Sequence, residues 1–200
     1  MVNIKSIFFD LFGVLLGIDQ SATIHHISKK VKLPYLETKD IVMGEIFMRL
    51  ERGEIEFKQY FQDLQYELPN GGNLSYDEFK IMWTTNKIDE LPTAELLTAL
   101  KEKYSLYIIS NTSEAHIAQL KTQFKLFYNF EDIITSESAK NRKPSIEIFN
   151  YALNRTGAVA ESSVFIDDMY SNVSAASNLG FSSHHYTSYE EFNKFIISLL

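Results

Sequence analysis

The chain has 200 residues, 45% of them apolar, which is enough to bury one core or a core that carries a smaller inserted domain. Its formal charge of −7 and the lack of a Lys/Arg-rich run argue against nucleic acid or an anionic membrane as a partner, and no stretch approaches the roughly 20 apolar residues of a spanning helix. The sequence has no Cys, which excludes disulfides and cysteine nucleophiles and fits a reducing compartment, so we expect a cytoplasmic protein.

The first predicted element is a strand that follows Lys5 and ends at Asp10, because a short apolar run closed by an acid and a Gly is typical of a central parallel strand. The next segment, 17–87, has apolar residues at helical spacing and no convincing strand. Within it, Ser75 followed by Glu78 is a helix-capping pattern. We interpret 17–87 as a small helical domain inserted after the first strand.

From residue 88 onward, predicted strands and helices alternate. The predicted strands are 106–109, 132–135, 164–166 and, more weakly, 181–186. The predicted helices are 93–104, 113–124, 145–156, 170–179 and 188–199. This alternation predicts an α/β fold in which helices cover both faces of a parallel sheet. The core domain would then comprise 1–16 and 88–200.

Polar residues follow several of these strands. Asp10 ends the first strand, Ser110 and Asn111 follow 106–109, and the pair 167–168, both Asp, follows 164–166. Lys143 comes later after its strand, at the start of the helix 145–156. Because the carboxyl ends of parallel strands form the ligand crevice of such sheets, we expect these side chains to meet at one edge.

This set of side chains fits the transfer of a phosphoryl group to a carboxylate. Asp10 would attack phosphorus as a covalent nucleophile, and Mg²⁺ would hold the phosphate against that like-charged group. Asp10, Asp168 and the backbone carbonyl of Phe12 are the predicted metal ligands, and Asp167 would support the metal through water or a hydrogen bond.

The phosphoryl oxygens need positive partners as charge redistributes during transfer. We expect these to be the Ser110 hydroxyl, the Lys143 ammonium and backbone N–H groups near Leu11, Phe12 and Asn111. The predicted catalytic residues are therefore Asp10, Ser110 and Lys143.

In order and spacing, these segments resemble the four motifs of the haloacid dehalogenase superfamily. The first motif corresponds to 9–15 (FDLFGVL), the second to 109–112 (ISNT) and the third to 142–144 (RKP). The fourth corresponds to 165–168 (FIDD), followed by Asn172 and Gly180. Residues 44–55 also resemble the helical cap of subfamily IA, in the branch of the bacterial glucose-1-phosphate phosphatases and the phosphatase domain of soluble epoxide hydrolases.

The resemblance implies a Rossmann-like core with an inserted helical cap, bound Mg²⁺ and a phosphoaspartate that water hydrolyses. It implies a small phosphate ester as the substrate, with a sugar phosphate as the best class, and both a monomer and a loose homodimer would fit.

The sequence departs from the family pattern at Phe12, where most phosphatases of the superfamily have a second Asp that serves as general acid and base. A positioned acid or base is typically worth about 10² to 10⁴ in rate. Asp19, Glu45, His25 and His26 are candidates to replace it.

Two alternatives stay open at this stage. The haloacid dehalogenases of the superfamily need no metal and have an aromatic Tyr at the position of Phe12, but they resemble Ser-Ser-Asn at the fourth motif, where this chain has Asp167 and Asp168. The second alternative is a catalytically weak binding or regulatory protein that has lost its acid–base residue.

Several other conspicuous residues favour a structural interpretation. The aromatic residues of the helical segment are expected to pack between its helices; they include Phe47, Phe57, Phe61 and Trp83. We also interpret His184 and His185 as structural, because no third metal ligand lies at a useful spacing.

Overall fold

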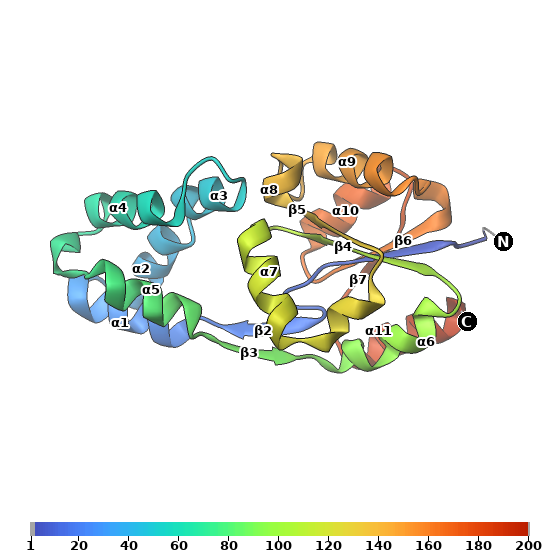
Figure 1. Cartoon of the computed structure of the whole chain (residues 1–200), viewed down its shortest axis with the longest axis horizontal. Helices are drawn as coiled ribbons and strands as arrows, with labels where there is room; N and C mark the ends of the chain where they lie inside the picture. Colours follow the sequence, from blue (N-terminus) through green and yellow to red (C-terminus); the bar gives the residue numbers. More distant parts are fainter. Residues whose placement is uncertain (1–2, 200) are drawn as a thin grey trace. The chain divides into compact units, whose positions relative to one another are not determined.

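The computed structural model describes residues 3–199. The chain divides into two compact units (Figure 1). The sheet unit combines the N-terminal residues through Gly17 with Asp89 onward, and the helical unit is Ile18–Ile88. The boundaries predicted from the sequence were 1–16 with 88–200 for the core and 17–87 for the insertion.

The sheet unit is built on five parallel strands in the order β5-β4-β1-β6-β7. These strands are β1 (Ser6–Phe9), β4 (Ser105–Ser110), β5 (Asp132–Thr135), β6 (Ser163–Asp167) and β7 (Ser182–His185). Each coincides with a predicted strand to within one or two residues. The predicted α/β class with a parallel sheet is confirmed.

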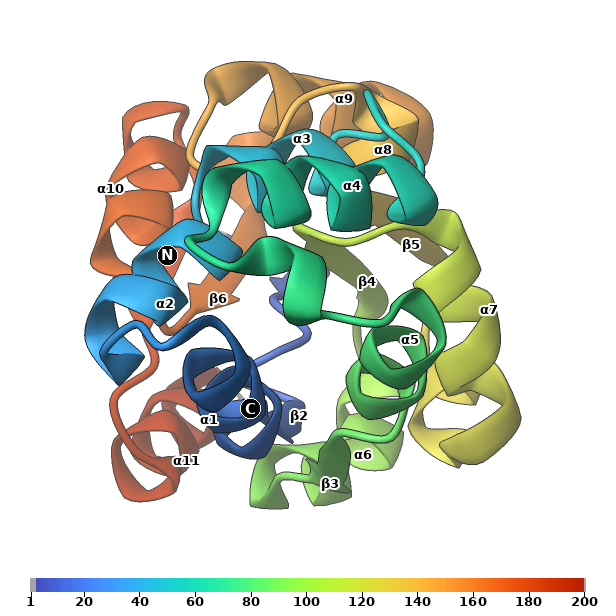
Figure 2. The same ribbon diagram turned by 90° about the vertical axis from the view of Figure 1, so that its left-hand side faces the viewer.

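Helices cover both faces of this sheet (Figures 1 and 2). One face carries α8 (Ser136–Ala139), α9 (Ile146–Thr156) and α10 (Tyr170–Asn178). The other carries α6 (Leu97–Lys101), α7 (Glu114–Gln123) and α11 (Tyr189–Leu199).

The alternation of side chains along β1 explains the two covered faces, since successive strand residues point to opposite sides of the sheet. Phe8 belongs to the apolar cluster that includes Phe149 of α9 and Ala176 of α10. Phe9 points the other way, and its ring centroid lies 6.4 Å from that of Phe192 in α11. Both Phe8 and Phe9 are fully buried, so β1 is the central strand that the apolar run predicts.

Some local details differ from the prediction. The predicted helix 93–104 is divided into a 3₁₀ turn, η2 (Pro92–Leu96), and the short helix α6. The helix predicted from residue 145 begins at Ile146, and α8 intervenes between it and β5. Two further 3₁₀ turns, η3 (Lys125–Asn129) and η4 (Ala160–Ser162), precede β5 and β6.

The expectation of no strand in the inserted segment was wrong at its two ends. There β2 (Leu16–Asp19) and β3 (Lys87–Glu90) form a separate two-stranded sheet where the chain passes between the units. Each strand has four residues and only one paired edge, so neither needs the long apolar run that marks a central strand.

The helical unit contains five α-helices and the 3₁₀ turn η1 (Gly71–Asn73). The helices are α1 (Ser21–Val31), α2 (Tyr35–Val42), α3 (Glu45–Glu51), α4 (Phe57–Glu67) and α5 (Tyr76–Thr84). Aromatic rings fill its centre, and the Phe79 ring stacks on Phe57 and Trp83 at centroid distances of 5.6 and 5.4 Å. The predicted packing role of the aromatic residues is confirmed for Phe47, Phe57, Phe61 and Trp83. Ser75 lies at the N-cap position of α5, but its side chain makes no capping hydrogen bond.

Tyr60 joins two helices of this unit. Its side chain is fully buried in α4, and its hydroxyl donates a 2.6 Å hydrogen bond to the Val42 carbonyl at the end of α2. Replacing Tyr60 with Phe keeps the ring and removes this bond, so we expect a loss of about 1–3 kcal/mol in the free energy of unfolding. Denaturant unfolding measures the loss, with the exposed Tyr66→Phe as the control that should leave the midpoint unchanged.

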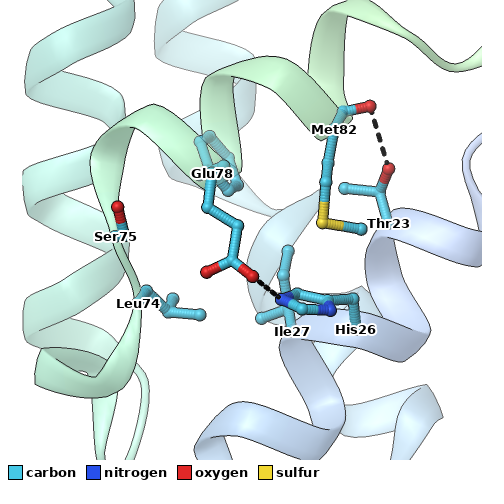
Figure 3. A pocket seen from close by; sticks show the side chains of 8 residues that line it. Thr23, His26, Ile27, Leu74, Ser75, Glu78 and Met82 are labelled. Atoms are coloured by element: carbon cyan, nitrogen blue, oxygen red, sulfur yellow. Dashed lines mark hydrogen bonds and ion pairs between the residues drawn. The ribbon is translucent and has the colours of Figure 1, made fainter.

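A small cavity lies between α1 and α5 of the helical unit (Figure 3). Across it, the His26 ring contacts Glu78 at 2.9 Å. Lys30 donates to the other Glu78 oxygen at 3.2 Å. The hydrogen bond from Lys30 lowers the pKa of Glu78. The cavity volume is about 10 Å³, close to the space that one water molecule requires. It is therefore too small to receive a substrate.

None of the helices formed by residues 3–199 has the length and hydropathy needed to span a bilayer.

Candidate active site

The register of the sheet brings two acidic residues together. In β1 and β6, Phe9 pairs with Ile166, and the Asp10 amide donates a 2.8 Å hydrogen bond to the Ile166 carbonyl. Asp10 directly follows Phe9, and Asp167 directly follows Ile166. Both acids therefore reach the carboxyl edge of the sheet at the same level. The sequence predicted this meeting because both acids directly follow an apolar strand.

Asp168 completes a cluster of three carboxyl groups. One oxygen each from Asp10, Asp167 and Asp168 lies within 4.8 Å of the others. Asp10 is 8% exposed and Asp167 is fully buried, whereas Asp168 is partly exposed. Carboxylates held this close repel one another when ionised, so the cluster requires cationic compensation.

Lys143 supplies one such positive charge. Its ammonium Nζ lies 2.8 Å from Asp10 Oδ1 and 2.6 Å from Asp167 Oδ2, and the side chain is only 1% exposed. The same ammonium lies 5.6 Å from the centroid of the Phe165 ring. Lys143 therefore bridges the ends of β1 and β6 in the interior, where Coulombic attraction is stronger than in water.

The protonation equilibria reflect this burial. Burial raises the pKa of Asp10 to about 8, against the opposing attraction of Lys143 and with a further rise from Asp167. Burial and repulsion from Asp167 also raise the pKa of Asp168. Burial disfavours charge on Lys143, but its attraction to Asp10 and Asp167 outweighs this, so the Lys143 pKa is raised and the ammonium stays charged. A divalent cation beside these carboxyl groups would favour their ionised forms and so lower the pKa values of Asp10 and Asp168.

Hydrogen bonds from the chain fix these groups. Both hydrogen bonds that the Asp10 carboxylate accepts within residues 3–199 go to Oδ1, one from Lys143 and one from the Leu11 amide at 2.6 Å. Asp167 Oδ1 accepts the Met169 amide at 2.8 Å, and Asn172 Nδ2 donates to both Asp167 oxygens at 2.9 and 3.1 Å.

The loop after β1 requires a glycine at position 13. Its φ is +86°, a left-handed conformation that favours glycine, and its amide donates to the Leu16 carbonyl at 2.8 Å. A Cβ at this position would lie 2.4 Å from Asp168 Oδ2. The absence of a side chain at Gly13 therefore lets the backbone approach Asp168.

Phe12, the residue that departs from the predicted acid–base pattern, has an aromatic partner that sequence reasoning missed. The His116 ring of α7 stacks on Phe12 with a centroid distance of 5.4 Å and an interplanar angle of 22°. His116 Nδ1 lies 3.0 Å from the Thr112 hydroxyl, and burial lowers the pKa of His116. Thr112 precedes the N-cap Ser113 of α7 and His116 lies in the first turn of that helix, so their short separation was a signal for this contact but not for the stack on Phe12.

His185 was interpreted from the sequence as structural, and the structure places it beside the cluster. Its Nε2 lies 3.0 Å from the Asp168 carbonyl oxygen, and its ring meets the exposed Tyr170 ring edge to face at 5.7 Å. Its neighbour His184 instead stacks on Phe195 of α11 with a centroid distance of 4.3 Å.

The other predicted site residues lie as follows. Ser110 is buried at the end of β4, next to β1, and Asn111 follows it and binds the backbone of Lys143. The four candidates for the missing acid belong to the helical unit, where each has a local partner. Asp19 accepts from the Ser21 amide, Glu45 pairs with Arg52, His25 contacts the Ser21 carbonyl and His26 pairs with Glu78.

The acidic cluster fits a hard divalent cation in its donor chemistry, because Mg²⁺ prefers oxygen ligands and often binds through one or two carboxylates. Asp10 and Asp168 offer such oxygens, and the backbone at Gly13 passes close to Asp168.

Comparison with known proteins agrees with this arrangement. Residues 4–180 match the haloacid dehalogenase-like hydrolase family. The D-ribitol-5-phosphate phosphatase of Bacteroides thetaiotaomicron is 28% identical over 89% of this chain and 89% of its own. An (S)-2-haloacid dehalogenase of Pseudomonas putida is 25% identical over 90% of this chain and 83% of its own.

A solved structure of a related enzyme has the same fold as this chain. A haloacid dehalogenase-family enzyme of Bacteroides thetaiotaomicron, in complex with magnesium and inorganic phosphate, is 27% identical with a TM-score of 0.76 and covers 95% of this chain and 99% of its own. Magnesium, the cofactor predicted from the sequence, is thus present in a relative of this fold. The predicted enzyme class is confirmed as well. With the match extending over most of its length, the chain belongs to the haloacid dehalogenase-like hydrolase family.

Proposed function

We propose that the protein is a magnesium-dependent phosphatase that hydrolyses a small phosphate monoester through a phosphoaspartate on Asp10. The observation that carries this proposal is the cluster of three carboxyl groups, two of which, Asp10 and Asp167, are buried against the Lys143 ammonium. It combines a nucleophile, oxygen ligands for a cation and a fixed positive charge at one edge of the sheet.

In the first step, a carboxylate oxygen of Asp10 forms a bond to phosphorus as the bond from phosphorus to the leaving oxygen breaks, and the leaving oxygen takes a proton from water or an acid. Lys143 and Leu11 both hold Oδ1, which orients the carboxylate for attack. The Lys143 ammonium stabilises negative charge as it moves onto the phosphoryl oxygens, and the Ser110 hydroxyl is proposed to donate to one of them.

Mg²⁺ would be held by Asp10, Asp168 and the Phe12 carbonyl, and when bound it supplies charge that screens the phosphate dianion from the carboxylates. In the second step, water attacks phosphorus, the bond to Asp10 breaks, and inorganic phosphate leaves with the proton balance completed by solvent or a base. Phe12 cannot supply that base. Asp19, Glu45, His25 and His26 of the helical unit remain the predicted candidates for this role.

A sugar phosphate or a related polyol phosphate is the proposed substrate class. Support comes from the similarity to the D-ribitol-5-phosphate phosphatase, which extends over 89% of both chains.

The dehalogenase alternative has specific support in the similarity to the Pseudomonas putida enzyme and in the aromatic residue Phe12. Against it, Asp168 adds a carboxylate to a cluster that already exceeds the charge of Lys143. Such an arrangement fits a reaction that uses a divalent cation better than a metal-free attack on carbon.

A phosphatase assay with two leaving groups tests the proposal. We expect hydrolysis of p-nitrophenyl phosphate with Mg²⁺ and none after chelation, since the p-nitrophenolate leaving group hardly requires protonation. D-ribitol 5-phosphate and other alkyl phosphates should react more slowly than p-nitrophenyl phosphate, by a factor of about 10² to 10⁴, if no other acid replaces the missing Asp. Equal rates would show that another acid does replace it.

The same protein is then incubated with a 2-haloacid without metal. Halide release in the absence of any phosphatase activity would replace the proposal with the dehalogenase alternative. Lack of activity in both assays would favour a binding or regulatory protein.

A further inference from the structure

The position of the Lys143 ammonium depends on Asp167. Asp167 is fully buried, and both of its oxygens are occupied by donors from the chain. Oδ1 accepts from the Met169 amide and Asn172, and Oδ2 accepts from Lys143 and Asn172. A carboxylate offers about four acceptor sites, and these four contacts use them. Asp167 is therefore oriented toward Lys143 and has little capacity left for a metal ion.

Asn172 is the residue that fixes this orientation. It lies in the first turn of α10, is 5% exposed, and its Nδ2 contacts both oxygens of Asp167. A buried carboxylate that lost this donor would keep an unsatisfied acceptor and could rotate away from the ammonium.

A second asparagine holds the other end of Lys143. Asn111 Oδ1 accepts the Lys143 backbone amide at 2.8 Å, and Asn111 Nδ2 donates to the Lys143 carbonyl at 3.1 Å. These two bonds join the loop after β4 to the loop before α9. The backbone of Lys143 thus has a fixed position relative to the edge of the sheet.

We propose that Asn172 and Asn111 are positioning residues for Lys143: Asn172 orients its ammonium through Asp167, and Asn111 fixes its backbone. Together they hold a buried cation 2.8 Å from Asp10 before any substrate arrives. The catalytic consequence of this inference rests on the proposed function. The positioning of the ammonium, however, is a property of the metal-free protein, so it can be measured separately.

The first test follows the Lys143 ammonium by NMR in magnesium-free protein labelled with ¹⁵N-lysine. A buried, hydrogen-bonded ammonium is expected to give a Nζ signal protected from exchange, which Lys143→Met identifies by its loss. Asn172→Leu, of similar shape, and Asn111→Leu should each weaken or shift this signal. Asn178→Ala, an exposed substitution on the same helix α10, should leave it unchanged. Asn172→Ser serves as a second variant if the Leu side chain impairs folding.

The second test is a double-mutant cycle on turnover. Asn172→Leu should lower kcat by about tenfold with little change in KM, as is common for residues that support an active-site group. In the Lys143→Met background the same substitution should have no further effect, because the group it positions is gone. A merely structural role would give the same loss in both backgrounds.

The outcomes separate the two proposals. An unchanged Nζ signal in both Asn172 variants, or equal losses of kcat in both backgrounds, would overturn the positioning role. A wild-type protein without phosphatase turnover whose Nζ signal is lost in Asn172→Leu would overturn the proposed function and confirm the support of Lys143.

Discussion

Asn in place of Asp10 is expected to abolish phosphatase turnover without unfolding the protein. The amide oxygen can still accept from the Leu11 amide and from Lys143, so the local hydrogen bonds survive. The amide is a poor nucleophile, however, and it cannot form a stable phosphoryl ester. We expect kcat to fall by about 10⁴-fold or more, as when other enzymes lose a nucleophile that acts together with its partners.

Release of p-nitrophenol at saturating Mg²⁺ measures this loss, and circular dichroism with a thermal melt checks the fold. The control is Asp132→Asn in the same sheet. Asp132 begins β5, at the opposite end of the strands from Asp10, and it pairs at 2.6 Å with Arg155 on the surface. This variant should keep full turnover.

A covalent readout makes the assignment specific. Borohydride reduction of the wild-type enzyme during turnover should convert the acyl phosphate on Asp10 to homoserine, which peptide mass spectrometry detects. Modification at another residue, or magnesium-dependent turnover that persists in Asp10→Asn, would contradict the proposed mechanism.

The sequence was sufficient to place the acids of the site because strand periodicity determines where a buried strand ends. Asp10 and Asp167 directly follow apolar runs in neighbouring strands, so their meeting required only the parallel topology. Ser110 could be placed at the same edge for the same reason, since it ends β4.

Lys143 was harder to place from the sequence. It lies eight positions after Thr135, the last residue of β5, and the unpredicted helix α8 occupies part of that interval. Its path to the site is set by the two hydrogen bonds that its backbone makes with the Asn111 side chain. Such contacts depend on the directions of individual side chains, which apolar periodicity does not encode.

The same limit explains the contacts of Asn172, His116 and His185. Asn172 follows the fourth motif, but only the geometry of α10 aims its amide at Asp167. His116 lies in the helix predicted at 113–124, and nothing in the sequence indicated that its ring would stack on Phe12. His185 lies on β7, whose short and largely polar sequence gave the weakest strand signal of the sheet.

The second large effect is expected at Gly13, where Ala would test the close approach of the first loop to Asp168. The substitution combines two costs. The backbone has φ of +86°, which disfavours any residue with a Cβ by about 1–3 kcal/mol. In addition, the new Cβ would lie 2.4 Å from Asp168 Oδ2, a distance that forces the loop or the carboxylate to move.

Gly157 provides a matched control because it separates these two costs. It also has a positive φ, +69°, at the C-terminal end of α9, but a Cβ there would meet no atom within 4 Å. Gly157→Ala should therefore lower the free energy of unfolding by about 1–3 kcal/mol through its backbone conformation alone, with turnover and magnesium activation unchanged.

Gly13→Ala should lower stability by more than the control and also raise the Mg²⁺ concentration needed for half-maximal activity, since Asp168 is a proposed ligand. We expect kcat/KM to fall by about 10²-fold, the loss that a displacement near 1 Å can cause at an active site. Isothermal titration calorimetry with Mg²⁺ measures the metal affinity of each variant independently of turnover. If Gly13→Ala and Gly157→Ala lost equal stability and both bound Mg²⁺ as the wild type does, the close approach of this loop would not be what places Asp168 for the cation.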